Sequence, residues 1–247
     1  MQIEHIYVVY TAISPEWMPA RHKDVYYERS DGSVVYMSGA PAQDGDLSTR
    51  IEVFQPDSPG LAQVGSWDLG REVITSDRVQ MFHDHVLVKE PGTTRPTPWH
   101  QDGPYYFVEG RQTVSFWSPV DPVKEASLRC VAGSHLWPRE VLPTRWLAET
   151  AFYPDPDTYM PVPDPDAEGM NVLEWQMEPG DAVAFHFRTL HGARGNPAAA
   201  RRRAFSLRLV GDDARYVERP GRISPPFPGH GMVAGQTLRE DWFPFLL

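Results

Sequence analysis

The sequence has little cysteine and no long hydrophobic run, and both scarcities narrow the class of protein. A single cysteine, Cys130, in 247 residues excludes an internal disulfide and a cysteine-rich zinc module. It lies in Leu128–Val131, a predicted strand, where a small buried side chain is expected rather than a nucleophile. No charged-then-apolar leader opens the chain, and no run approaches the roughly 18 apolar residues of a transmembrane helix. We therefore expect a cytoplasmic protein with no membrane association.

Basic residues are also scarce. Lysine and arginine number 23 against 33 aspartates and glutamates, which gives a formal net charge of -10. An acidic chain without a basic stripe is a poor ligand for nucleic acid or for an anionic membrane surface. We expect a small-molecule substrate as the partner, and the sequence does not indicate an oligomeric state.

Turn-forming residues, in contrast, are abundant. The 25 prolines and 19 glycines separate short extended segments, without helices alternating between them. This arrangement predicts antiparallel sheets folded into a sandwich or jelly roll, as one domain over residues 1–247. The predicted strands are Ile3–Thr11, Ser33–Ser38, Arg50–Phe54, Val79–Lys89, Trp99–Val108, Gln112–Pro119, Leu128–Val131, Val172–Met177, Ala182–Phe187 and Arg202–Val210.

Helices and loops are expected between these strands. The apolar pattern over 58–77 predicts one or two helices, and 138–150 a short helix broken by Pro143. The segment 153–169, rich in proline and aspartate, predicts a long loop, which is expected to be either a lid over a site or disordered. From Arg219 onward the apolar tail is expected to pack on the body of the protein.

The candidate site begins with His100 and Asp102. Residues two apart on a strand project to the same face, so this imidazole and carboxylate can reach one point. They would form two thirds of a site with two histidines and one carboxylate. His191 is the best candidate for the third ligand, because it lies where a later strand ends at Gly192 and can face a pocket mouth.

Other histidines compete for the same role. His83 and His85, also two apart, are a possible pair of metal ligands, but their apolar neighbours favour core histidines or neighbours of the site. His186, between two phenylalanines, is expected to pack or to support the site. Among the arginines at 201–203, Arg202 faces opposite to the other two, and an inward guanidinium is suited to bind a carboxylate bidentately.

Several motifs, in order and spacing, resemble the phytanoyl-CoA dioxygenase family over about residues 79–210. They are Trp99-His100-Gln101-Asp102, Gly133-Ser134-His135, Gly180-Asp181-Ala182-Val183-Ala184-Phe185-His186, and His191-Gly192 through Asn196 to Arg202-Arg203-Ala204-Phe205-Ser206.

The resemblance implies a mostly β fold, a cupin-like double-stranded β-helix (jelly roll) with a few flanking helices and its core at about 79–210. It also implies Fe(II), the co-substrate 2-oxoglutarate and O2. The implied iron ligands are His100, Asp102 and His191, and Arg202 would pair with the distal carboxylate of 2-oxoglutarate. The positions expected to line the co-substrate are Gln101, Trp117 and His85.

Two departures from the family pattern occur in the chain. Ala126-Ser127 replaces the usual Asn-Gly, and Ala132 precedes Gly133-Ser134-His135 where the family has proline. Asp102 is retained, whereas halogenating members have a small residue there, so the resemblance favours hydroxylation. A zinc hydrolase or isomerase with the same ligands, and a non-catalytic ligand-binding jelly roll, are the alternatives.

Overall fold

A computed structural model describes residues 25–28, 34–37, 74–146, 150–153 and 156–246. In this part of the chain the secondary structure is almost entirely β, with three short 3-10 helices. The strands expected at 3–11 and 50–54, and most of the helical segment expected over 58–77, fall outside it. No helix in the described ranges is long and apolar enough to cross a membrane.

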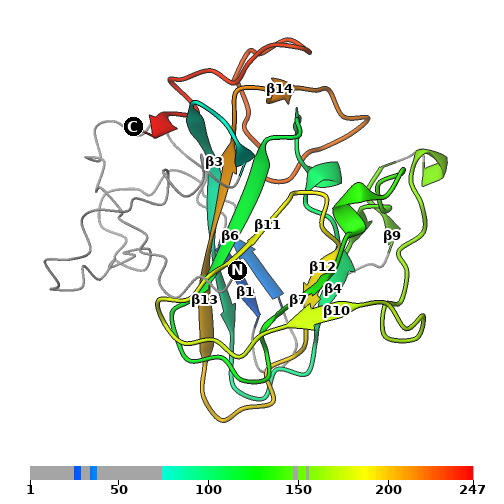
Figure 1. The fold of residues 1–247 in the computed structure, drawn as a ribbon, viewed down its shortest axis with the longest axis vertical. Helices are drawn as coiled ribbons and strands as arrows, with labels where there is room; N and C mark the ends of the chain where they lie inside the picture. The colour runs from blue at the N-terminus through cyan, green and yellow to red at the C-terminus, as the bar shows by residue number, and fades with distance from the viewer. Residues whose placement is uncertain (1–24, 29–33, 38–73, 147–149, 154–155, 247) are drawn as a thin grey trace, which may run out of the picture.

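The elements follow the numbering of Figure 1. They are β1 (Val25–Glu28), β2 (Val34–Met37), β3 (Val79–Lys89), β4 (Thr97–His100), η4 (Gly103–Tyr105), β5 (Val108–Glu109), β6 (Thr113–Pro119), β7 (Leu128–Val131), η5 (Ser134–Leu136), β8 (Thr144–Arg145), β9 (Thr150–Ala151), η6 (Pro156–Thr158), β10 (Val172–Glu174), β11 (Val183–Phe185), β12 (His191–Ala193), β13 (Arg202–Val210), β14 (Arg215–Tyr216) and β15 (Phe245–Leu246).

Two sheets form the framework of the fold. The larger runs in the order β11-β6-β13-β3-β1-β2, with β15 also paired to β3, and the smaller runs β10-β7-β12-β4. Except for the parallel pair β1 and β3, neighbouring strands in both sheets are antiparallel. The smaller sheet lies beside the larger one (Figure 1), and strands of both contribute to one cavity. This is the expected jelly roll.

Strand β13 shows why these residues pair as they do. Arg202, Ala204, Ser206 and Arg208 are buried, and the outer neighbours Arg201 and Arg203 are exposed, as strand alternation requires. The register with β3 shifts after Arg208, because Arg208 pairs with His83 and the next residue pairs two positions further along. The extra residue of this bulge is Phe82. A bulge of this kind redirects side chains, and Phe82 and His83 both contact the Tyr106 ring.

Four expectations are corrected by the structure. The strand predicted over 172–177 ends at Glu174. The strand predicted over 99–108 is interrupted, since β4 ends at His100 and a 3-10 helix follows at Gly103–Tyr105. Pro104, one of the first residues of that helix, cannot donate a backbone hydrogen bond, which favours the break. The helix predicted over 138–150 is wrong: the described residues of this segment contain β8 and the first residue of β9, and none of them is helical. The strand predicted over 182–187 ends at Phe185, before His186.

The largest buried cluster lies at one end of the larger sheet. Phe82 packs there against Phe107 and Phe187. Residues of the C-terminal tail, Phe227 and Phe243, are buried in the same cluster and contact the Phe82 ring. The tail therefore lies on the sheet that carries β3, next to the candidate site.

Candidate metal centre

The two candidate histidines lie on adjacent strands of the smaller sheet. His191 on β12 is the register partner of His100 on β4, and their ring centroids are 4.1 Å apart. Gly192 allows this close pairing, because a Cβ there would lie 3.0 Å from the carbonyl oxygen of Thr97. His186, at the end of the strand predicted over 182–187, is separated from His191 by a turn that leads from β11 in the larger sheet to β12.

Both imidazoles are held by backbone carbonyls. The Nδ1 atom of His100 lies 2.8 Å from the carbonyl oxygen of Pro98, and Nδ1 of His191 lies 2.9 Å from that of Thr189. A carbonyl can only accept a hydrogen bond, so each Nδ1 must carry the proton. Each Nε2 atom is then left with a lone pair, as a metal ligand requires.

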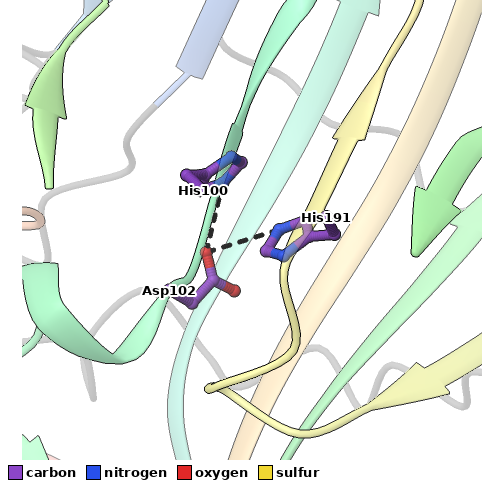
Figure 2. Close-up of side chains that lie close together, drawn as sticks. All are labelled: His100, Asp102 and His191. Atoms are coloured by element: carbon purple, nitrogen blue, oxygen red, sulfur yellow. Dashed lines mark ion pairs between the residues drawn. The ribbon is translucent and has the colours of Figure 1, made fainter. Parts of the chain in front are cut away.

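Both lone pairs face the carboxylate of Asp102 (Figure 2). Oδ1 of Asp102 is 3.6 Å from Nε2 of His100 and 3.7 Å from Nε2 of His191. Ligand atoms of the three residues lie within 4.8 Å of one another, and all three side chains are buried. Asp102 achieves this from a helical backbone conformation just past the end of β4, rather than from the same strand face as His100.

The second carboxylate oxygen of Asp102 is fixed by two buried side chains. Oδ2 accepts a hydrogen bond from Oγ of Ser115 at 3.2 Å and from a guanidinium nitrogen of Arg208 at 3.3 Å. Burial alone would raise the pKa of Asp102, but the charge of Arg208 and the neighbouring imidazoles hold it well below its usual range. The carboxylate is therefore ionised, with Oδ1 directed to the histidines.

Burial affects His191 in the opposite direction. Desolvation, and then the charge of His100, lower the pKa of His191 to about 3, against the opposing effect of Asp102. The imidazole is consequently neutral at physiological pH. A neutral imidazole beside an ionised carboxylate is the protonation state in which both can bind a cation.

The three residues open on a cavity of about 670 Å³ between the sheets. The structure places three of the predicted co-substrate residues in its wall: His85 on β3, Trp117 on β6 and Arg202 on β13. The Arg202 guanidinium lies over the Trp117 ring, 5.5 Å from its centroid, and only 4% of Arg202 is exposed.

Gln101 does not lie in this wall. Its side chain points away from the cavity, where Nε2 donates to the carbonyl of Arg188 at 2.5 Å and Oε1 accepts from the backbone N–H of Val141 at 2.8 Å. The physical reason is these two hydrogen bonds, which fix the side chain of Gln101 just beyond the end of β4. Gln101 ties the turn before His191 to the segment around Val141.

Sequence reasoning missed Arg208 and Ser115. Both are buried in the larger sheet, at 5% and 0% exposure, and both contact the same oxygen of Asp102. Arg208 did leave a signal, since it has the same strand parity as Arg202 and lies between Leu207 and Leu209. A cation within an apolar strand needs a buried partner. Ser115 left no comparable signal.

The competing pair, His83 and His85, lies next to the site. Their ring centroids are 4.6 Å apart, and His85 lines the cavity. His83 is 7% exposed, and its ring is packed edge-on to the Tyr106 ring. Among the described residues, the cluster with metal-ligand geometry is His100, Asp102 and His191, and does not include this pair.

The structure also shows where Cys130 and the loop 153–169 lie relative to the cavity. Cys130 is 4% exposed in the core between the sheets, and burial raises the pKa of its thiol to about 12, as suits a packing residue. No described residue of the loop 153–169 lines the cavity. The wall on that side consists instead of Thr144, Arg145, Trp146 and Phe152.

The fold and the cluster together define a class: a jelly-roll protein with two histidines and one carboxylate grouped in the wall of an inter-sheet cavity. A family model described as phytanoyl-CoA dioxygenase (PhyH) matches residues 45–204, which is more than half of the chain. The chain belongs to the phytanoyl-CoA dioxygenase family.

A relative agrees with this assignment. The chain is 28% identical over 198 residues to a probable phytanoyl-CoA dioxygenase of Caenorhabditis elegans, a match that covers 72% of this chain and 60% of that protein. The chain thus matches about three fifths of the length of this relative.

Two solved structures share the fold at 24% identity. The non-heme alpha ketoglutarate dependent carbocyclase SnoK from nogalamycin biosynthesis has a TM-score of 0.54, with 72% of this chain and 67% of that one covered. The epimerase SnoN, in complex with Fe3+, alpha ketoglutarate and nogalamycin RO, has a TM-score of 0.57, with 72% and 68% covered.

Proposed function

We propose that this protein is an Fe(II)- and 2-oxoglutarate-dependent oxygenase that hydroxylates a small organic molecule, with release of succinate and CO2. The observation that carries the proposal is the arrangement of the two Nε2 atoms and Oδ1 of Asp102 around one point in the cavity. Family membership and the solved relatives that use alpha ketoglutarate support it.

The donor set fits iron. Two imidazoles and one carboxylate, grouped on one side of a shared point, are the ligands of non-haem Fe(II) oxygenases, which leave positions open for co-substrate and O2. The carbonyls of Pro98 and Thr189 fix both rings, and Arg208 and Ser115 fix the carboxylate. Such supports keep ligands oriented before the metal arrives.

Arg202 fits the co-substrate. A guanidinium presents paired N–H donors that match a carboxylate in a bidentate manner, and this one is buried in the wall of the same cavity. Arg202 would hold the distal carboxylate of 2-oxoglutarate, with the Trp117 ring packed against the guanidinium and His85 lining the same wall.

The residues of the chain position the substrate and keep water out of the cavity. When bound, iron would activate O2, the oxidant, with two electrons supplied by oxidation of 2-oxoglutarate, and the cavity wall decides which substrate carbon is presented there. Tyr105 is fixed by hydrogen bonds with the backbone of Thr144, and it borders the cavity together with Tyr106 and Trp146. This aromatic wall excludes water from the reacting position.

Binding of 2-oxoglutarate to Mn(II)-loaded protein, measured by calorimetry, tests the proposal without turnover. We expect saturable binding in the wild type and a loss of roughly 100-fold in Arg202→Ala, because a charge-assisted bidentate pair is removed. Arg203→Ala is the matched control, since the exposed Arg203 pairs with Asp121 outside the cavity. No binding in the wild type, or equal binding in Arg202→Ala, would overturn the proposal.

Succinate release and metal analysis then distinguish the iron oxygenase from a zinc hydrolase or isomerase. We expect substrate-stimulated succinate release with iron, and its loss in Asp102→Ala. Stoichiometric zinc that survives chelation, together with hydrolytic or isomerase activity, would instead identify a zinc enzyme.

A further inference from the structure

Arginines are concentrated on the cavity wall of this acidic protein. The charged side chains that line it are Lys89, Asp102, Arg145, Arg202, Arg208 and Arg222. Five of these are cationic and one is anionic, although the whole chain has a net charge of -10. Fixed charge of one sign in a cleft with low-dielectric walls attracts ligands of the opposite sign.

Most of these charges have an assigned role. Arg208 holds Asp102, and the ammonium group of Lys89 donates to the carbonyls of Arg95 and Arg194 at 3.1 and 3.0 Å. Under the proposed function, Arg202 binds 2-oxoglutarate. Arg145 and Arg222 remain. Both are exposed and line the cavity, which places them at its rim, and neither forms an ion pair with another described residue.

The surface between these two arginines and the metal ligands is apolar. Phe152 lies beside Arg145, whose guanidinium carbon is 5.7 Å from the ring centroid, and Trp146 packs edge-on to the His100 ring at 4.8 Å. Nε1 of Trp146 donates to the hydroxyl of Tyr105 at 3.3 Å, so the indole is held in place. Ile223 follows Arg222 in the lining.

We propose that Arg145 and Arg222 form an anion-binding rim, and that the substrate is a small apolar organic acid. Its single anionic group, a carboxylate or phosphate, is bound by the two guanidiniums. Its apolar body lies against Phe152, Trp146 and Ile223 and reaches toward the metal ligands. This inference rests on the proposed function, since it assumes that 2-oxoglutarate is bound by Arg202 and the metal centre. A cavity of about 670 Å³ is in the range of small-molecule sites.

Charge-matched probes test the rim directly. We suggest calorimetric titration of Mn(II)- and 2-oxoglutarate-saturated protein with ω-phenylalkanoic acids of increasing chain length, and with the corresponding alcohols and alkyl phosphates. The best acid or phosphate should bind roughly ten- to hundredfold more tightly than its alcohol. This advantage should shrink at high ionic strength, because exposed charges are screened.

The variants assign the effect to the two residues. In Arg145→Gln/Arg222→Gln the advantage of the anion over the alcohol should be lost, while affinity for the alcohol stays. Arg111→Gln, an exposed arginine outside the cavity lining, should retain the advantage. Comparison of the acid and phosphate series identifies the anion.

Failure of this inference can be distinguished from failure of the proposed function. If 2-oxoglutarate binds and depends on Arg202, but no anion in the series binds better than its alcohol, the rim is wrong and the proposed function stands. An anion advantage that persists in the double variant, or weaker 2-oxoglutarate binding in that variant, also overturns the rim. If 2-oxoglutarate itself does not bind, the proposed function fails, whatever the probes show.

Discussion

Two pairs of histidines lie close to each other at the cavity, which His85, His100 and His191 line, and only one of the pairs is arranged to bind a metal. The rings of His83 and His85 are 4.6 Å apart, and those of His100 and His191 are 4.1 Å apart. Proximity therefore does not distinguish the pairs. The difference lies in what surrounds each ring.

The second pair has supports on both sides of each ring. One nitrogen of each ring donates its N–H to a backbone carbonyl, and Oδ1 of Asp102 stands opposite the other nitrogen. His83 has no hydrogen-bond partner at either ring nitrogen among the described residues, and its environment is aromatic. A metal site thus needs an oriented lone pair and a negative charge, in addition to imidazoles.

Removal of the carboxylate should erase the difference between the pairs. We expect Asp102→Ala to lose metal affinity well beyond the roughly 10- to 100-fold that loss of an outer support costs, because a charged ligand is removed. Mn(II) titration by calorimetry or electron paramagnetic resonance measures this. Asp84→Ala is the matched control, since Asp84 lies between the two histidines of the first pair. Near-native affinity in Asp102→Ala would show that the carboxylate is not a ligand.

Loss of Arg208 should weaken the site by less. Its guanidinium contacts Oδ2 of Asp102 and leaves Oδ1 for the metal, so Arg208→Met should cost roughly 10- to 100-fold in Mn(II) affinity. The variant also leaves a buried carboxylate without its cation, a change that destabilises proteins by about 3–5 kcal/mol.

Arg208→Lys keeps the charge and guards against a simple folding defect. We expect it to regain part of the lost metal affinity, with thermal unfolding of the metal-free protein followed in parallel. If both variants lose stability but bind Mn(II) as the wild type does, Arg208 supports the fold and not the orientation of Asp102.

The long, regular strands were predictable from sequence. The segments 79–89, 128–131 and 202–210 have the predicted bounds, because runs of β-branched and apolar residues end at turn-forming sequences. The segment 138–150 was not predictable, since its residues suit a helix locally but pair as strands in the tertiary structure. Pairing of β8 with β9, which follows it closely in the chain, overrides weak local helix propensity.

The site was predictable in its residues but less so in its geometry. Residue types and spacing selected His100, Asp102 and His191, yet Asp102 reaches the shared point from a helical turn that alternation does not describe. Resemblance placed Gln101 in the wall, whereas hydrogen bonds to Arg188 and Val141 hold it outside. Side-chain direction beyond the end of a strand depends on such tertiary bonds.

The smallest expected effect concerns the first pair. His83→Leu should leave Mn(II) affinity within about twofold of the wild type, because His83 is not among the clustered ligands. A large loss would mean that the two pairs act as one site, and the same titration used for Asp102→Ala would detect it.

The same variant should alter the pH dependence of stability in the metal-free protein. Burial, and then the charges of His85 and Arg208, lower the pKa of His83 well below its usual value near 6.5. Below that value the unfolded chain therefore binds a proton at His83 that the folded protein excludes. In this acidic range the free energy of unfolding therefore decreases as the pH is lowered, by up to about 1.4 kcal/mol per pH unit for one such group.

His83→Leu removes that contribution, and His191, whose pKa is lowered to about 3, retains its own. Urea unfolding at several pH values between neutral and mildly acidic should therefore show a shallower decline in the variant than in the wild type. An unchanged slope would mean that His83 stays protonated inside the fold. It would then resemble a charged, partnered histidine, and the contrast between the two pairs would rest on the Asp102 carboxylate alone.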